Sequence, residues 1–245
     1  MSARRTLAVG HRVLTQLRRD PRTLALLLVV PCLLMVILRY AFEEQEQVFQ
    51  RVGPPLVGLL PFITMFIVTS IAMLRERTSG TLERMMSMPV AKLDLLGGYA
   101  LAFGAVAVVQ TALVAAVSFG PLGLESERST LLLVVLALLN ALLGMSLGLF
   151  ASAFATSEFQ AVQFMPAVVL PQLLLCGLFV AREDMARWLE AISAVLPLTY
   201  AYDGVPPATP PDALGARFVV GLVVVVGVTL GALALGAASM RRRSG

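Results

Sequence analysis

Few side chains in this sequence have the chemistry for acid–base, nucleophilic or metal-assisted catalysis. The single histidine, His11, lies among arginines, and Cys32 and Cys176 each lie in an apolar segment without a second cysteine nearby. We interpret the cysteines as packing residues and expect no metal site. Three acidic residues are the only candidates for a membrane-embedded enzyme: Glu183, Asp184 and Asp203. Their surroundings are typical of solvated charge, so an enzyme is the less favoured hypothesis.

The apolar segments of the chain contain no Asp, Glu, Lys, Arg or His in their central parts. A proton- or sodium-driven carrier usually needs an ionisable group at membrane depth, so this absence argues against that class. No G-x-x-x-x-G-K-[ST] sequence occurs, and the chain therefore does not bind ATP through a P-loop. Polar residues in the apolar segments are also too sparse for an ion pore.

The main polar residues within the apolar segments are four amides: Gln110, Asn140, Gln163 and Gln172. Hydrogen bonding from helix to helix is the usual role of such side chains in a membrane. Lining a substrate path is the second interpretation. Two pairs of glycines, Gly144 with Gly148 and Gly227 with Gly231, have the small-xxx-small spacing that permits close contact between helices.

The polar loop from Arg75 to Asp94 carries the most specific pattern. Gly80 permits a turn, Thr81 can cap a short helix, and Pro89 ends that helix before the next apolar segment. The helix would have an apolar side formed by Leu82, Met85 and Met86. Its other side would carry the charged residues Glu83 and Arg84. Held parallel to the membrane, it would offer an apolar knob with a charged rim to a partner protein. A loop that only sets topology is the alternative.

The elements that position this loop are long apolar helices. Of the 245 residues, 58% are hydrophobic and 14% are charged. Typical soluble domains carry about 25% charge, so we predict an all-α integral membrane protein with a single transmembrane domain over residues 1–245. Six segments are long and apolar enough to cross a bilayer: residues 22–38, 54–74, 95–119, 130–154, 161–180 and 217–240. Three prolines predict a kink in the second of them: Pro54, Pro55 and Pro61.

Basic residues gather on one side of the predicted membrane. With residues 1–22, 75–94, 155–160 and 240–245 on that side, it holds 13 of the 19 Lys and Arg but only 5 of the 15 Asp and Glu. The positive-inside rule then places both termini in the cytoplasm of a multi-pass cell-membrane protein. Residues 1–20 have the pattern of an amphipathic helix in the lipid headgroup layer, and a plain basic tail is the alternative. No basic face with interleaved aromatics indicates a nucleic-acid partner.

The segment 181–215 joins the fifth and sixth predicted spans. Charged residues precede the apolar piece 191–201, which is too short to cross a bilayer. Trp188, Tyr200 and Tyr202 are of the types that are enriched at membrane interfaces. We therefore expect a re-entrant or surface helical hairpin on the outer side of the membrane.

Two parts of the sequence resemble one known family. Residues 75–90, R-E-R-T-S-G-T-L-E-R-M-M-S-M-P-V, resemble the RE-x-x-x-GTLE-x-x-x-x-x-P motif of type 2 ABC exporter permeases, which include daunorubicin-type drug efflux permeases and glycan exporters. Residues 177–180 and 188–200 resemble the signature that follows the fifth helix in that superfamily. Because the chain length, the six spans and the basic N-terminal helix also fit, the resemblance covers nearly the whole chain.

The resemblance implies a transmembrane subunit without an ATPase site of its own. Such permeases form dimers with an identical or paralogous copy and work with separate ABC ATPase subunits, which bind the ATP and Mg²⁺, so no cofactor is expected on this chain. The helix from about Gly80 to Met86 would be the coupling helix that docks on the ATPase, and Glu83 would pair with a basic group there. The residues of the coupling region are Glu76, Arg77, Gly80, Thr81, Leu82, Glu83, Arg84 and Pro89.

The function that the resemblance implies is ATP-driven export. The substrate would be amphipathic or hydrophobic, drug-like or lipid-like, and would leave the cytoplasm or the inner leaflet. In that family the N-terminal helix is an interfacial elbow, and the hairpin after the fifth span caps the outer mouth of the pathway. A glycan or polysaccharide exporter of the same superfamily is the alternative. A membrane-embedded enzyme and a channel or assembly scaffold are less favoured.

Overall fold

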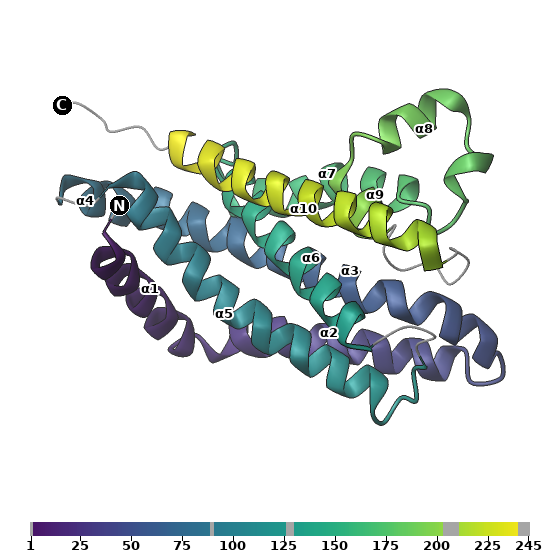
Figure 1. The fold of residues 1–245 in the computed structure, drawn as a ribbon. Helices are drawn as coiled ribbons and strands as arrows, with labels where there is room; N and C mark the ends of the chain where they lie inside the picture. The colour runs from purple at the N-terminus through teal and green to yellow at the C-terminus, as the bar shows by residue number, and fades with distance from the viewer. Residues whose placement is uncertain (1, 89–90, 126–129, 203–210, 240–245) are drawn as a thin grey trace.

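The computed structural model describes residues 2–88, 91–125, 130–202 and 211–239. These residues form helices and no strand, and the helices make an elongated bundle (Figure 1). Six helices are long and apolar enough to cross a membrane: α2 (Pro21–Ala41), α3 (Glu46–Thr78), α5 (Lys92–Phe119), α6 (Thr130–Ala151), α7 (Glu158–Leu175) and α10 (Pro211–Ser239). The prediction of an all-α membrane protein with six spans is confirmed.

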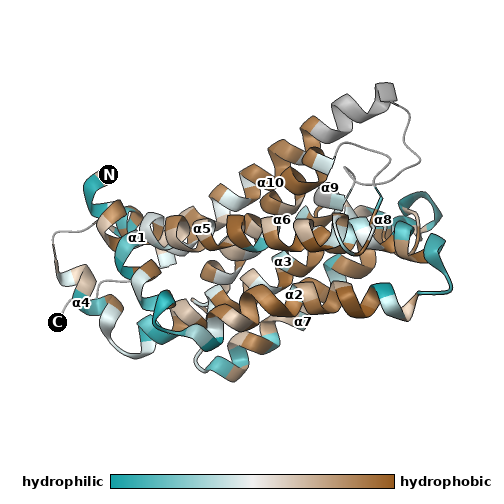
Figure 2. Ribbon diagram, turned by 90° about the horizontal axis from the view of Figure 1, so that it is seen from below, coloured by the Kyte–Doolittle hydropathy of each residue, from teal (hydrophilic) through white to brown (hydrophobic). Residues whose placement is uncertain are grey.

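Shorter helices lie at the two ends of the bundle. They are α1 (Ala3–Arg18), α4 (Thr81–Ser87), α8 (Arg187–Ser193) and α9 (Pro197–Tyr202), and a single 3₁₀ turn spans Arg182–Asp184. Helices α1 and α4 share one end with the last turn of α10, whereas α8 and α9 lie toward the other (Figure 1). We call these the α4 end and the α8 end. Figure 2 shows hydrophobic colour along the long helices and hydrophilic colour mainly at the two ends.

Asp20 followed by Pro21 is a sequence signal for the start of a helix, and helix α2 begins there. The Asp20 carboxylate accepts a hydrogen bond from the backbone N–H of Thr23 at 3.2 Å and another from the Thr23 hydroxyl at 2.6 Å. Pro21 then occupies the first turn, where a residue without an N–H costs nothing. These contacts separate α2 from α1, so the chain changes direction between the two helices.

Helix α3 is longer than the span predicted over residues 54–74. It contains 33 residues, which corresponds to about 50 Å of helix, and it passes through all three prolines without interruption. At its C-terminal end the residues 75–78, which we expected in the loop, continue the helix. Three charged side chains of the predicted loop are therefore held on a rigid element: Arg75, Glu76 and Arg77. The kink expected from the prolines stays a prediction.

The centre of the bundle is the contact between α3 and α6. A Cβ atom added at Gly144 would overlap the carbonyl oxygen of Phe62, and one added at Gly148 would overlap that of Phe66. Only glycine lets the two backbones come this close. The close helix contact predicted for this pair of glycines is thus confirmed within the chain.

Three helices lie at the periphery of the subunit. The most apolar part of each of these helices is mostly exposed: the buried share is 17% in α2, 17% in α7 and 22% in α10. The corresponding share is 56% in α3 and in α6. An added Cβ at Gly227 or Gly231 of α10 would meet no packed neighbour within 4 Å, so this second glycine pair makes no close helix contact among the described residues. The peripheral helices therefore keep broad apolar faces exposed.

The segment between α7 and α10 contains two short helices. Leu198 and Thr199 of α9 are buried, whereas Trp188 of α8 is 65% exposed. The apolar piece expected over residues 191–201 is therefore divided between α8 and α9. Residues 203–210 of the predicted hairpin lie outside the described residues, and its re-entrant depth stays a prediction.

Two of the spans end earlier than predicted. Helix α6 ends at Ala151 and α7 at Leu175, short of residues 154 and 180. After α7, Gly177 has a φ of +99°, a conformation that favours glycine. An added Cβ there would lie 3.4 Å from the ring of Tyr202. The turn at Gly177 thus brings α9 back onto the bundle.

Candidate functional site

The predicted short helix after the second span is present as α4. Gly80 joins it to α3 with a φ of +72°, which is unstrained for glycine, and occupies the N-cap position. Thr81 is therefore the first helical residue and not the cap that we predicted, and its hydroxyl lies 2.9 Å from that of Ser79. The helix ends at Ser87. Pro89, the predicted stop signal, lies outside the described residues.

The apolar side of α4 faces the core of its own subunit. Leu82 is 4% exposed and Met86 is 8% exposed, and both belong to a cluster with Val13 and Leu17 of α1 and Tyr99 of α5. A helix of seven residues is not stable alone, so this burial holds it in place. The predicted apolar knob is therefore wrong for these two residues. The exposed residues of the segment are Glu83, Arg84, Ser87 and Met88.

Helix α1 contacts this region through Arg12. One guanidinium nitrogen of Arg12 lies 2.7 Å from the sulfur of Met85, and the other lies 3.3 Å from a carboxylate oxygen of Glu76. Glu76 is 5% exposed, so its negative charge is compensated within the subunit. The amphipathic pattern of residues 1–20 predicts a helix in the lipid headgroup layer, but Arg12 contacts α3 and α4 of the same chain. The position of Arg12 beside Val13, at the border of the apolar face, was the one sequence signal for this contact.

One face of α1 is built into the subunit. A Cβ added at Gly10 would lie 3.2 Å from the carbonyl oxygen of Gly98, which shows how closely α1 approaches α5. The backbone N–H of Ser2 donates to the carboxylate of Asp94 at 2.9 Å, and Asp94 is 1% exposed. Leu7 is 63% exposed, so another face of the same helix remains available for the lipid headgroup layer.

The remaining charges at the end of α3 bind other helices of the same subunit. Arg75 makes two contacts with the Glu158 carboxylate of α7, at 2.7 and 3.0 Å. A guanidinium nitrogen of Arg77 donates to the hydroxyl of Ser239 in α10 at 3.3 Å. Of the charged residues predicted for coupling, Glu76 and Arg77 therefore hold the bundle together, while Glu83 and Arg84 are on the surface.

The polar residues of the spans occupy different settings. The amide nitrogen of Gln110 donates to the carbonyl of Leu27 at 2.7 Å and to the hydroxyl of Thr64 at 2.6 Å, which joins α5 to α2 and α3. Gln172 is buried and donates to a carbonyl of its own helix at 3.0 Å. Gln163 is exposed on α7. Gln110 is thus a link between helices, and Gln163 lies where a second protein chain can reach it.

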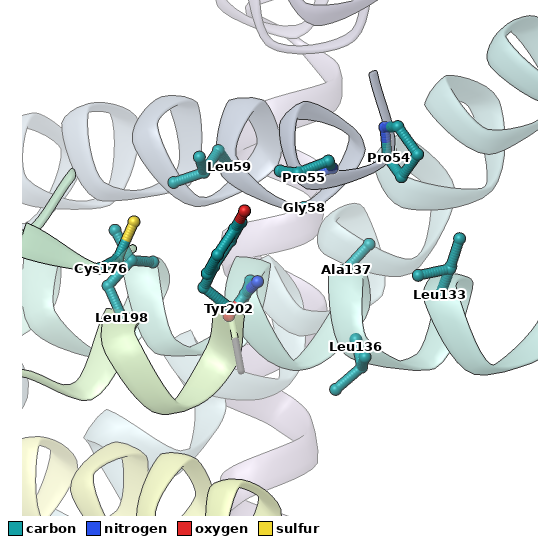
Figure 3. Close-up of a pocket in the computed structure, with 11 residues that line it drawn as sticks. Pro54, Pro55, Gly58, Leu59, Leu133, Leu136, Ala137, Cys176, Leu198 and Tyr202 are labelled. Carbon is teal, nitrogen blue, oxygen red and sulfur yellow. The ribbon is translucent and has the colours of Figure 1, made fainter. Parts of the chain in front are cut away.

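Asn140 lines a small cavity between α3, α6 and α9. Figure 3 shows Tyr202 of α9 extending toward Pro55 and Gly58 of α3. The cavity has a volume of about 10 Å³, which is room for about one water molecule. The side-chain oxygen of Asn140 accepts no hydrogen bond within the described part of the chain. We interpret the cavity as a hydration site for that oxygen; it is too small for a substrate.

The sequence contains one hydrolase-like pattern, and its setting in the structure excludes it from catalysis. Residues 144–148, G-M-S-L-G, match the G-x-S-x-G pattern of hydrolases, which requires a turn from strand to helix. Here the pattern lies inside α6, where Ser146 is fully buried and donates to the carbonyl of Leu143 at 2.9 Å. Among the described residues, no group of three His, Cys, Asp or Glu side chains could hold a metal ion.

These observations define a multi-pass membrane protein that carries a short amphipathic helix, with an exposed charged side, at one polar end. Comparison with protein families agrees with this class. The family described as ABC-2 type transporter matches residues 4–206. The chain therefore belongs to the ABC-2 type transporter family.

Individual relatives are similar at low identity. The chain is 26% identical over 149 residues to ABC transporter G family member 20 of Dictyostelium discoideum. These residues make up 61% of this chain and 20% of that protein. It is 26% identical over 152 residues to the probable multidrug ABC transporter permease YbhR of Escherichia coli, and the match covers 62% of this chain and 41% of that permease. The inner membrane transport permease YhhJ of Escherichia coli is 28% identical over 147 residues, and the match covers 59% of this chain and 39% of that permease. The matched part is less than half of each relative.

Proposed function

We propose that this chain is the permease subunit of an ATP-driven exporter and that α4 is its docking surface for a separate ABC ATPase subunit. One observation carries the proposal: α4 is anchored by its apolar side, with Glu83 and Arg84 turned outward, in a chain of the ABC-2 family. Because Leu82 and Met86 pack on α1 and α5, a displacement of α4 would move both helices.

In this proposal the energy comes from the partner. The ATPase subunit would bind ATP and Mg²⁺, and the permease would act as a transport subunit without an ATPase site of its own. The α4 end would then face the cytoplasm, together with the arginine-rich N-terminal helix, as the positive-inside rule requires. Hydrolysis would drive a rearrangement between inward and outward states that differ in their affinity for the substrate.

A second permease copy, identical or paralogous, would cover part of the exposed apolar faces. Helices α2, α7 and α10 keep most of their apolar parts unburied, and Gln163 of α7 and the pair Gly227 and Gly231 of α10 lie on such surfaces. Glycine pairs and polar side chains are the usual means of helix association in membranes.

The proposed substrate is amphipathic or hydrophobic, either a drug or a lipid-like molecule. The span centres carry no ionisable residue, so an apolar molecule meets no desolvated charge there. One of the relatives is named a probable multidrug permease, which favours this class over a glycan.

Charge reversal at α4 tests the docking surface. We expect Glu83→Arg and Arg84→Glu, each coexpressed with a candidate ABC ATPase subunit, to reduce copurified ATPase and permease-stimulated ATP hydrolysis by about tenfold. Reversed charges at an interface repel the partner. Glu190→Arg on exposed α8, at the opposite end, is the control and should change neither quantity. Unchanged complex formation in both α4 variants would contradict the proposal, as would uphill transport by the chain alone.

A further inference from the structure

A larger cavity lies at the α4 end, between α1, α2, α3 and α5. Its volume is about 380 Å³, which is within the range of roughly 300–1,000 Å³ for small-molecule sites. It is separate from the exposed side of α4 and from the small cavity beside Asn140. None of the roles assigned above uses it.

The cavity has a polar rim and an apolar interior. Asp20 precedes α2, Arg75 and Glu76 lie near the C-terminal end of α3, and Thr64 lies about three turns earlier in α3; all four line the cavity. We call the end with Asp20, Arg75 and Glu76 the rim. Between them the walls are aliphatic, with Leu26, Leu27 and Val30 from α2 and Ile67, Val68 and Ile71 from α3. From Thr64 to Arg75 the helix rises about 17 Å, which is close to the roughly 15 Å of hydrocarbon in one leaflet. The cavity thus has the polarity and the length of half a bilayer.

One wall of the cavity opens toward the membrane. Leu26 lines the cavity and is 63% exposed, and α2 buries only 17% of its apolar part. An occupant can therefore enter sideways from the surrounding leaflet. Its apolar walls, its length and its opening beside the exposed Leu26 suit the flexible acyl chain of a lipid.

The polar groups at the rim indicate the kind of headgroup. The rim carries both signs of charge, with the Arg75 guanidinium and the Asp20 carboxylate lining the same cavity. Tyr99 also lines it and is 1% exposed. Its hydroxyl lies close enough to Glu76 and Arg12 to interact with them, yet it makes no hydrogen bond of standard geometry with any described residue.

We propose that this cavity binds one acyl chain of a zwitterionic phospholipid drawn from the leaflet at the α4 end. The phosphate lies near Arg75, the ammonium group lies near Asp20, and the acyl chain follows α2 and α3 toward Thr64. Binding at this site does not depend on the proposed export function, because it can be measured on the permease alone.

The test is lipid retention by the purified chain in nanodiscs of phosphatidylethanolamine and phosphatidylglycerol. A diazirine-bearing phosphatidylethanolamine is photolysed, and the labelled peptides are identified by mass spectrometry. We expect labelling of α2 and α3 residues that line the cavity. Val30→Trp fills the cavity and should reduce that labelling by about tenfold, because a packed side chain leaves no room for the acyl chain. Val29→Trp, next to it on the exposed side of α2 at 56% exposure, should leave labelling unchanged.

A second pair of variants tests the headgroup. Arg75→Gln removes the cation from the rim, whereas Glu158→Gln breaks the same ion pair but keeps Arg75 in place. We expect only Arg75→Gln to weaken labelling by phosphatidylethanolamine. Ile71→Trp, from the α3 wall, shows whether any loss follows from filling the cavity and not from misfolding of α2.

Three results would overturn the proposal. One is equal labelling in Val30→Trp and Val29→Trp. Another is a preference for phosphatidylglycerol over phosphatidylethanolamine, which would assign an anionic headgroup. The third is a disulfide between Val30→Cys and a cysteine introduced in α7 of a second copy, which would place a protein helix in the cavity.

Discussion

At the scale of single residues, the contact between Arg12 and Glu76 has the clearest energetic consequence. Glu76 is almost fully buried, and the Arg12 guanidinium at 3.3 Å is its only ion-pair partner within the described residues. Removing one member of such a pair leaves a charge without compensation, which costs more than the pair itself contributes. Arg12 therefore matters for the stability of the α4 end although it lies outside the family motif.

We predict that Arg12→Ala lowers the free energy of unfolding in detergent by about 1–3 kcal/mol, less than for a fully buried pair because Arg12 is partly exposed. Arg4→Ala, an exposed arginine of the same helix, should change it by less than about 0.5 kcal/mol. The double variant Arg12→Ala with Glu76→Gln should recover part of the loss, because no buried charge remains. Equal effects of Arg12→Ala and Arg4→Ala would show that the contact contributes nothing.

The cap of α2 makes a second prediction at this scale. Hydrogen bonds from the Thr23 side chain and backbone hold the pKa of Asp20 below its ordinary value of 3.8. Folding lowers the pKa of this carboxyl, so its ionised form stabilises the native state at any pH above the pKa of the unfolded chain. This stabilisation is lost as the pH falls through the lower pKa of the native state. Asp20→Ala should cost about 1 kcal/mol at pH 7. That difference should shrink below pH 3.8 in acid titrations of unfolding, whereas a constant difference would rule out the charged cap.

At the scale of elements, the contact between α3 and α6 decides how tightly the bundle packs. Glycine has a low helix propensity, so Gly→Ala in an open helix surface usually stabilises a protein. At Gly148 the sign is reversed, because a Cβ would overlap the Phe66 carbonyl and the Thr69 hydroxyl. Thr69 also donates to the carbonyl of Met145 at 3.1 Å, so any separation of the helices weakens an interhelical hydrogen bond.

We therefore predict that Gly148→Ala lowers the free energy of unfolding by about 1–3 kcal/mol. The matched control is Gly231→Ala, whose added Cβ meets no packed neighbour in the described part of the chain. This variant should leave the free energy of unfolding unchanged or slightly increased. Unfolding of the two variants in the same detergent compares them directly. A loss for Gly231→Ala that appears only in the assembled complex would place that glycine at the interface with the second copy.

At the scale of the whole molecule, the α4 end and the α8 end should face opposite sides of the membrane. In a variant without Cys32 and Cys176, we expect a single cysteine at Ser87 to react with a membrane-impermeant maleimide only in inside-out vesicles. A cysteine at Val195, which is 80% exposed between α8 and α9, should react only in intact cells. Reaction of both on the same side would contradict the six-span topology, and the reverse labelling would contradict the proposed orientation.

Much of the architecture was predictable because membrane thickness imposes it locally. Six apolar runs of suitable length predicted six spans, and the positions of Asp20 and Pro21 predicted where α2 begins. Gly80 and the polar residues around it predicted a short helix that begins within one residue of the observed start of α4 at Thr81. The cap of α4 was misassigned to Thr81, because a left-handed glycine ends one helix and begins the next without a side-chain hydrogen bond. The length of α3 was underestimated, because charged residues beyond the apolar layer continue the helix.

The sequence by itself determined that the chain is a helical membrane protein, which segments cross the bilayer and where a short amphipathic helix forms, since these depend on local composition and periodicity. Only the tertiary structure decided which side of α4 is exposed, that Arg12 compensates Glu76 across 64 residues of chain, and that four helices enclose an amphipathic cavity. These features depend on which helices become neighbours. That choice is made by packing between segments far apart in the chain, and no local pattern encodes it.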